Sequence, residues 1–192
     1  YSVGVGLAID GKVHSGKNAA AGDIGHAVID PRGRRCECGQ FGCLETFVSF
    51  PALVRRISNE ARLGRPTVLL PANVGEPRIE TLNQIIDAAL ANDEVAREAV
   101  EEAGRYLAIA VSMLNVIVAP DVVYIGGTLS RGYELIISSM KPMLQQRGPE
   151  LHRKGLEIEP ASFRDDSSLM GAAALVYENR LRDNHLSIHS AS

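Results

Sequence analysis

One loop holds all three cysteines of the chain, and it constrains the fold more than any other feature. The cysteines are Cys36, Cys38 and Cys43. They are too close together for the spread-out disulfide framework of a small secreted domain. His26 completes a set of three thiolates and one imidazole, which tetrahedral structural zinc prefers. Because Gly39 and Gly42 allow sharp turns between the last two thiolates, the sequence predicts a zinc site in a reducing compartment.

The alternative is a structural role without a metal. In that interpretation the cysteines are small core residues and His26 is a hydrogen-bonded core histidine. The surrounding loop is rich in glycine and arginine, which favours metal binding, and Arg34 and Arg35 would help to keep the thiolates ionised.

Composition limits the remaining possibilities. The chain has 192 residues, 45% of them hydrophobic and 22% charged, with a net charge of −3. These values are typical of one globular domain, or of half of a two-domain protein, and they exclude disorder. There is no Lys/Arg cluster to mark a nucleic-acid surface and no apolar run of the ~18 residues that a membrane span needs. We expect a cytoplasmic protein without a membrane partner. The chain begins at Tyr1 inside a predicted strand, as expected for a piece of a longer protein.

The hydrophobic pattern predicts strands that alternate with helices in the second half of the chain. The expected strands are Tyr1–Ile9, Lys12–Ser15, Ile24–Ile29, Val122–Ile125 and Leu156–Ala161. Two short helices should follow the cysteine loop, and longer ones should span Thr81–Ala91, Asp93–Val118, Tyr133–Gln146 and Leu169–Arg182. This order favours an α/β fold with a parallel portion of the sheet covered by helices.

Two carboxylates flank the cysteine loop. Asp23 precedes His26 by three residues, and Glu45 follows the last cysteine by two. With the free nitrogen of the histidine they could line a polar pocket suited to a neutral polyol, whose hydroxyls both donate and accept hydrogen bonds. Alternatively, Asp23 is a turn residue and Glu45 a carboxylate at a helix N-terminus.

The string G-D-I-G-H, nine further residues and then C-E-C-G-Q-F-G-C-L-E resembles the motif of the ROK family (repressors, open reading frames and sugar kinases). The resemblance implies an actin-like ATPase (ribonuclease H-like) domain, with a mixed sheet, helices on both faces, and the zinc loop and a helical insertion. It implies zinc ligands at His26, Cys36, Cys38 and Cys43, and sugar binding by Asp23, His26 and Glu45. Asp23 departs from the family's glutamate and is shorter by one methylene.

The same resemblance points to a nucleotide site. The family's kinases have a motif of the type I-G-G-G, and Gly126, Gly127 and Thr128 stand at that position here. A strand-end turn capped by Thr128 or Ser130 is the alternative interpretation. The kinases also have G-T-G in the first hairpin, where this chain has Ser2-Val3-Gly4.

We therefore predict that residues 1–182 form the C-terminal ROK domain, with the zinc loop at 26–43 and a frayed tail at 183–192. The amino-acid sequence of the zinc loop is most similar to that of the family's transcriptional regulators. The favoured function is a sugar-sensing, oligomerising domain, a homodimer or homotetramer that takes a sugar or sugar-phosphate effector. DNA would be read by an N-terminal domain outside this chain. The alternatives are half of an ATP-dependent sugar kinase, with no catalytic residue of its own in this chain, and a zinc-stabilised assembly module without a ligand.

Overall fold

The computed structural model of the protein describes residues 2–69, 79–146, 155–163 and 166–177. The chain starts with a small hairpin, β1 (Ala8–Ile9) and β2 (Lys12–Val13), followed by the 3-10 turns η1 (Lys17–Ala19) and η2 (Ile24–His26). After the cysteine loop come α1 (Glu45–Val48), α2 (Phe50–Arg62), α3 (Ile79–Leu90) and α4 (Glu94–Val118). The remaining elements are β3 (Val122–Ile125), η3 (Thr128–Gly132), α5 (Tyr133–Gln146), β4 (Glu157–Pro160) and a helix over residues 167–177.

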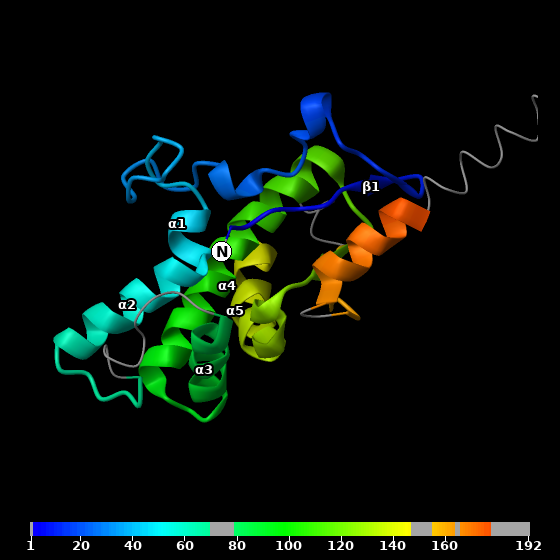
Figure 1. Cartoon of the computed structure of the whole chain (residues 1–192). Helices are drawn as coiled ribbons and strands as arrows, with labels where there is room; N and C mark the ends of the chain where they lie inside the picture. The colour runs from blue at the N-terminus through cyan, green and yellow to red at the C-terminus, as the bar shows by residue number, and fades with distance from the viewer. Residues whose placement is uncertain (1, 70–78, 147–154, 164–165, 178–192) are drawn as a thin grey trace, which may run out of the picture.

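The long helix α4 is the centre of the molecule, with α1, α2, α3 and α5 packed around it (Figure 1). Asp93 caps its N-terminus, where the Asp93 side chain accepts a hydrogen bond from the backbone N–H of Ala96. Ala119, in a left-handed conformation just before Pro120, caps its C-terminus. Its inner face is rich in alanine, so neighbouring helices approach closely. At Gly104 an added Cβ would lie 2.1 Å from the Ser139 Oγ of α5.

The core is built mainly from aliphatic side chains of these helices. Leu44, Ile57, Ile85, Val100 and Ile136 are among its buried members. Helical periodicity puts one apolar face of each helix toward α4, and removal of these faces from water is the main stabilising term. The helices predicted over Thr81–Ala91, Asp93–Val118 and Tyr133–Gln146 are confirmed to within two residues at each end, and the last predicted helix is confirmed over its described part. Pro51 lies in the first turn of α2, as expected.

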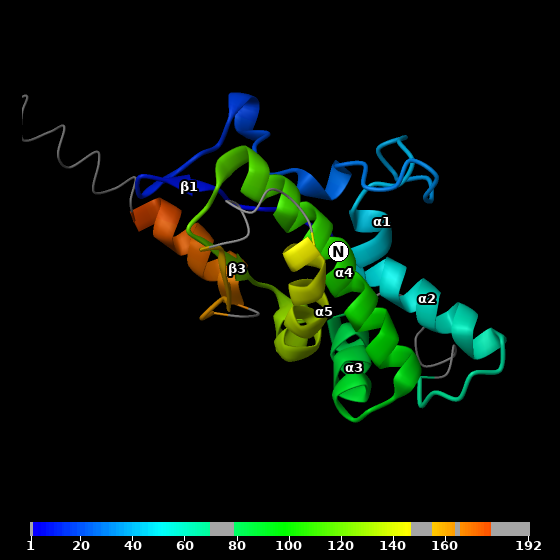
Figure 2. The same ribbon diagram turned by 180° about the vertical axis from the view of Figure 1, so that it is seen from behind.

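The strands of the described residues form two separate pairs. β3 and β4 are parallel, with Val122 opposite Glu157 and Ile125 opposite Pro160, and β1 and β2 are antiparallel. The Tyr133 hydroxyl of α5 donates a hydrogen bond of 2.6 Å to the Ile158 carbonyl oxygen, which ties helix to sheet. Residues 23–45, which include the cysteine loop and are called the metal loop from here on, lie with α2 at one end of the molecule. β3, β4 and residues 167–177 lie at the other end (Figure 1; Figure 2).

Two predicted strands are wrong in detail. In the segment Ile24–Ile29, residues 24–26 form the 3-10 turn η2, and only Val28 makes a bridge, to Cys43. In Tyr1–Ile9, only Ala8 and Ile9 are paired as a strand. The reason is the same in both cases: a strand needs an extended, hydrogen-bonded neighbour. These two segments meet each other only through single contacts, the hydrogen bond from the Val5 N–H to the Gly22 carbonyl oxygen and the packing of Gly25 against Val3.

The α/β class predicted from the sequence is confirmed. The parallel pair and its connecting helix α5 follow the predicted order, and β3 and α5 have the expected bounds. Within the described residues, no helix is both long enough and apolar enough to span a bilayer. The predicted tail at 183–192 and the end of the last helix lie outside the described residues.

Candidate metal centre and sugar site

The structure brings His26, Cys36, Cys38 and Cys43 together. One ligand atom from each of these residues lies within 4.8 Å of all the others. The Cys38 and Cys43 sulfurs are 3.6 Å apart, and Cys36 Sγ is 3.5 Å from His26 Nδ1. Zn–S bonds of about 2.3 Å place neighbouring ligands of a tetrahedral site about 3.8 Å apart. The four residues therefore fit zinc once the longest separations between their ligand atoms, up to 4.8 Å, shorten to about 3.8 Å.

Glycines give the backbone the shape that the cluster needs. Gly42 has φ of 71°, and a Cβ there would lie 1.5 Å from the Asp30 carbonyl oxygen, so only glycine fits. Its N–H donates to the Arg34 carbonyl oxygen at 2.8 Å, which closes the loop on itself. Within the loop the Cys36 N–H donates to the Gln40 carbonyl oxygen at 2.8 Å. The turn holds the three sulfurs on one side.

The turn η2 aims His26 at the cysteines. Gly25 is buried against the backbone of Val3, where an added Cβ would lie 2.4 Å from the Val3 carbonyl oxygen. The His26 N–H donates to the Asp23 carbonyl oxygen at 3.0 Å, and the chain then passes beside Cys43 through the Val28 bridge. An extended strand would carry His26 past the cluster, so the 3-10 turn is what completes the ligand set.

The thiols differ in acidity. Glu45 accepts a hydrogen bond of 2.9 Å from Cys36 Sγ and raises the pKa of Cys36 to about 12. Burial, and then the neighbouring Cys38, raise the pKa of Cys43. A backbone hydrogen bond from Gln40, followed by Cys36, lowers the pKa of Cys38. A cation among the sulfurs would favour all three thiolates, since metal binding releases thiol protons.

Of the three predicted sugar ligands, the structure joins two. The Glu45 Oε1 lies 3.6 Å from His26 Nδ1, and the side chain of Glu45 is 18% exposed against 46% for His26. Asp23 is exposed at the start of η2. Among the described residues, no hydrogen bond or ion pair links its carboxylate to His26 or Glu45. The role of Asp23 in sugar binding therefore stays a prediction.

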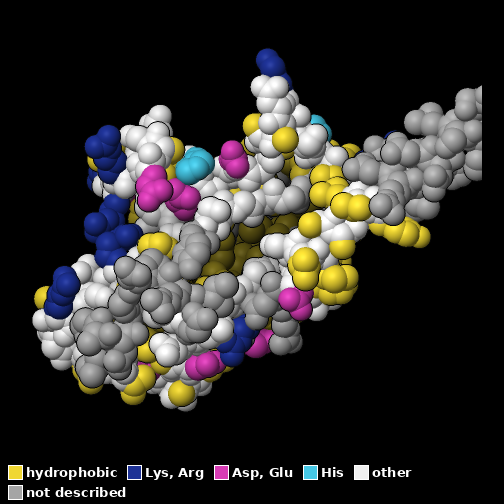
Figure 3. Space-filling model, in the orientation of Figure 1, with side chains coloured by type: hydrophobic (Ala, Val, Ile, Leu, Met, Phe, Trp, Pro, Cys, Tyr) yellow, Lys and Arg dark blue, Asp and Glu magenta, His cyan; other side chains and the backbone are white. Residues whose placement is uncertain are grey.

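The predicted nucleotide residues line a cavity of about 550 Å³. Gly126, Gly127 and Thr128 lie on one wall, and Ser2-Val3-Gly4, from the other end of the sequence, lie in the same cavity. Leu82, Leu107 and other apolar side chains form the rest. Figure 3 shows a deep, mostly hydrophobic hollow in the middle of this face. Ser130 Oγ donates to the Gly127 carbonyl oxygen at 2.7 Å, so this serine stabilises the turn after β3.

The arginines near the loop fall into two groups. Arg56 and Arg65 form ion pairs with Glu98, and Arg65 also pairs with Glu60. Arg34, expected to assist the thiolates, lines a pocket together with Arg55. Sequence reasoning missed this pocket, because its walls come from three separate segments.

Comparison of the whole fold defines the class of protein: solved structures that match it have the actin-like fold of ATPases and sugar kinases. A ROK family transcriptional regulator, a homologue of Escherichia coli Mlc, matches with a TM-score of 0.74 and 30% identity, over 83% of this chain and 39% of its own. A ROK family glucokinase from Streptomyces griseus, in complex with glucose and AMPPNP, matches with a TM-score of 0.76 and 27% identity, over 90% of this chain and 56% of its own.

The family follows from the sequence comparison. The model of the ROK family matches residues 2–179, and this chain belongs to the ROK family. The transcriptional dual regulator NagC of Escherichia coli K12 is 29% identical over 90% of the chain. A kanosamine kinase of Amycolatopsis mediterranei is 36% identical over 90% of it. The chain spans 41% of the length of the regulator and 52% of that of the kinase, and the family resemblance predicted from the motif is confirmed.

Proposed function

We propose that this chain is the effector-binding and oligomer-forming part of a ROK-family transcriptional regulator, with zinc in the loop at 26–43 and a sugar or sugar phosphate as effector. The observation that carries the proposal is the contact of His26 with both the cysteine cluster and Glu45. It makes one side chain a member of two sites. The full-length protein would be a cytoplasmic homodimer or homotetramer, and it would bind DNA through another segment.

The sugar site rests on the two ring nitrogens of His26. Nδ1 faces Cys36 and Glu45, at 3.5 and 3.6 Å, which leaves Nε2 for a ligand outside the cluster. With a metal bound at Nδ1, the His26 ring would keep one orientation, as ligating histidines do when an outer hydrogen bond orients them. The Glu45 carboxylate beside the ring can accept from hydroxyl groups, so the two side chains together would suit a polyol. Sugar affinity would then depend on the orientation of His26.

Val3 favours the regulator over the kinase. A threonine hydroxyl at this position could donate to a phosphate, and the valine side chain cannot. Val3 packs against the core, and its backbone lies against Gly25 of the turn that carries His26. Ser2-Val3-Gly4 therefore supports the metal loop. In the family's kinases the corresponding segment binds phosphate, whereas here we assign it a structural role.

A kinase is the second candidate, and the cavity at Gly126–Thr128 favours it. Gly127 has φ of 73°, and a Cβ built there meets no atom within 4 Å, so a ligand can approach the backbone closely. The 36% identity to a kanosamine kinase points the same way. In that case the full-length protein would transfer phosphate from ATP to a sugar, and the residues here would bind but not catalyse.

In the regulator, ligand binding would act through domain closure. A sugar held by His26 and Glu45 would link the metal loop to the other lobe of the full-length protein. Closure would then change the spacing of two DNA-reading domains. A ligand with different affinities for the open and closed states is all that such a switch needs.

Calorimetric titration of the full-length protein with hexoses, amino sugars and their 6-phosphates tests the proposal. We expect one class to bind, Glu45→Gln to weaken it about tenfold or more, and Asp23→Glu, which restores the family residue, to tighten it. The bound sugar should change the affinity for DNA. Binding that Glu45→Gln leaves unchanged would contradict the sugar site, and sugar-dependent ATP turnover would establish the kinase instead.

A further inference from the structure

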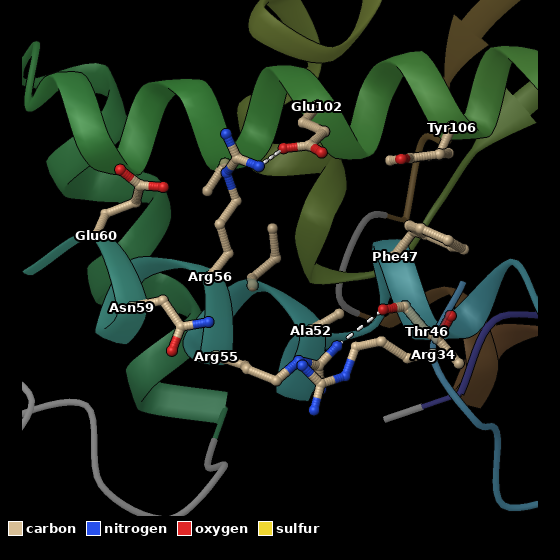
Figure 4. A pocket seen from close by; sticks show the side chains of 12 residues that line it. Arg34, Thr46, Phe47, Ala52, Arg55, Arg56, Asn59, Glu60, Glu102 and Tyr106 are labelled. Carbon is tan, nitrogen blue, oxygen red and sulfur yellow. Dashed lines mark hydrogen bonds and ion pairs between the residues drawn. The ribbon is translucent and has the colours of Figure 1, made fainter. Parts of the chain in front are cut away.

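A second pocket, of about 250 Å³, lies where the metal loop meets α2 and α4 (Figure 4). Arg34 comes from the loop, Thr46 and Phe47 from α1, Arg55 and Arg56 from α2, and Glu102 and Tyr106 from α4. The pocket is separate from the cavity at Gly126–Thr128, and the two share no lining residue.

The guanidinium groups of Arg34 and Arg55 point toward each other at one end of this pocket (Figure 4). Arg55 Nη2 donates to the Thr46 carbonyl oxygen at 2.9 Å, which holds the group in place. Burial, and then the charge of Arg34, lower the pKa of Arg55. Two cations held this way repel each other and attract an anion between them.

The carboxylates nearby are already engaged. Glu102 pairs with Arg56, and Glu60 pairs with Arg65 at 3.2 Å. Among the described residues, no ion pair includes Arg34 or Arg55. The acids in the wall therefore leave the two facing arginines uncompensated.

Two buried side-chain atoms in the pocket wall have no hydrogen-bond partner among the described residues. They are the Nε of Arg56 and the Oε2 of Glu102, although the two side chains form an ion pair through the Arg56 Nη1. Buried donors are almost always paired, so an unpaired one calls for an explanation. At the other side Phe47 and Tyr106 stack with ring centroids 4.2 Å apart and give the pocket an apolar wall. The volume is several times the ~30 Å³ share of one water molecule.

From these contacts we infer a binding site for a small oxyanion, a phosphate or carboxylate on a compact organic group, held by Arg34 and Arg55 in the pocket between the metal loop, α2 and α4. Guanidinium groups bind such anions through paired N–H donors, and the aromatic wall accommodates the carbon part. The inference concerns a site distinct from the sugar site and does not depend on the proposed function.

Titration of the protein with inorganic phosphate and with glycerol 3-phosphate tests the inference. Calorimetry gives the affinity, and NMR of the arginine Nε–H signals locates the anion. We expect saturable binding of both probes, tighter for the ester, and a loss of about tenfold or more in Arg34→Gln and Arg55→Gln. Arg34→Gln is the safer variant, since Arg34 is exposed, whereas Arg55 also holds Thr46.

A matched control separates this site from general charge. Arg62→Gln removes the same charge from an exposed position of α2 outside the pocket and should leave phosphate affinity unchanged. An equal loss in Arg62→Gln, no saturable binding to the unaltered protein, or binding of an acidic peptide but of neither small anion would overturn the inference.

Discussion

The metal loop (residues 23–45) and the helical body around α4 are held together by different means. In the loop, His26 and Cys38 are exposed, strand pairing is limited to isolated bridges, and glycine turns shape the backbone. In the body, Ile57, Ile85 and Ile136 are fully buried between helices. The comparison shows that the conformation of the loop depends on a few side chains and glycine turns. The packing of the helical body depends on the apolar surface that it buries.

Metal removal should separate the two regions most clearly. We expect about one zinc per chain by metal analysis, and its removal by a chelator should lower stability by about 4 kcal/mol or more. Cys43→Ser should have the same effect, because Cys43 is the fully buried ligand. Hydrogen exchange should rise at residues 26–43, while circular dichroism retains the helical signal of the body. A chelator should not destabilise Cys43→Ser further, and a second loss there would contradict the assignment.

Gly42→Ala tests the shape of the loop without removing a ligand. A Cβ at this position meets the Asp30 carbonyl oxygen at 1.5 Å, so the loop must open, at about 3 kcal/mol, with loss of metal. Gly39→Ala is the matched control. Gly39 also has a positive φ, of 94°, but a Cβ there meets nothing within 4 Å. It should cost about 1 kcal/mol and keep the metal. Equal costs in denaturant unfolding would argue against this loop geometry.

Gly104→Ala tests the body. The added Cβ would lie 2.1 Å from Ser139 Oγ and 2.8 Å from the Ile136 carbonyl oxygen, so α4 and α5 must separate. We expect a loss of about 2 kcal/mol in urea unfolding with the metal content unchanged. Adding Ser139→Ala should restore part of the stability, because the closest contact disappears. Without such coupling in the double mutant, the close approach of α4 and α5 would be wrong.

Asp93 should contribute the smallest effect, and a pH-dependent one. Burial raises the pKa of Asp93, but hydrogen bonds from the N–H groups of Ala96 (2.9 Å) and Val68 (2.7 Å) outweigh burial, so the net pKa is lowered. Its stabilisation is therefore present above the unfolded pKa of about 3.9 and is lost as pH falls through the folded value.

Asp93→Ala should accordingly cost about 1 kcal/mol at pH 7, and less as the solution is acidified below pH ~4. Asp93→Asn keeps a cap acceptor and should lose less. Urea unfolding at both pH values measures the difference. A cost that is independent of pH would show that the charge of Asp93 has no part in capping α4.

Helices could be predicted from the sequence better than strands. The bounds of α5 and β3 agree with prediction, and α4 starts one residue after the predicted Asp93 because that residue is the cap. Helical hydrogen bonds join residues four apart, so a local pattern contains the information. The segment 24–29 was predicted wrongly because Gly25 packs against Val3, a contact between distant residues.

The candidate sites divide in the same way. The cluster of His26, Cys36, Cys38 and Cys43 could be predicted because the residue types and their spacing are local, and the structure places all four together. The position of Asp23 at the start of the turn η2 could not be predicted, since the sequence pattern indicated a strand there. Nor could the pocket of Arg34 and Arg55, because α4 supplies a wall from residues far along the chain.

The sequence by itself determined the ligand chemistry, the family and the helical segments, because residue type and short-range spacing specify them. The tertiary structure decided which distant segments meet: Val3 with Gly25, Ser2-Val3-Gly4 with Gly126–Thr128, and Arg34 with Arg55. The physical reason is that these contacts depend on how the helices pack around α4. Different packing arrangements differ in buried apolar area and in close contacts, and a local sequence pattern contains neither quantity.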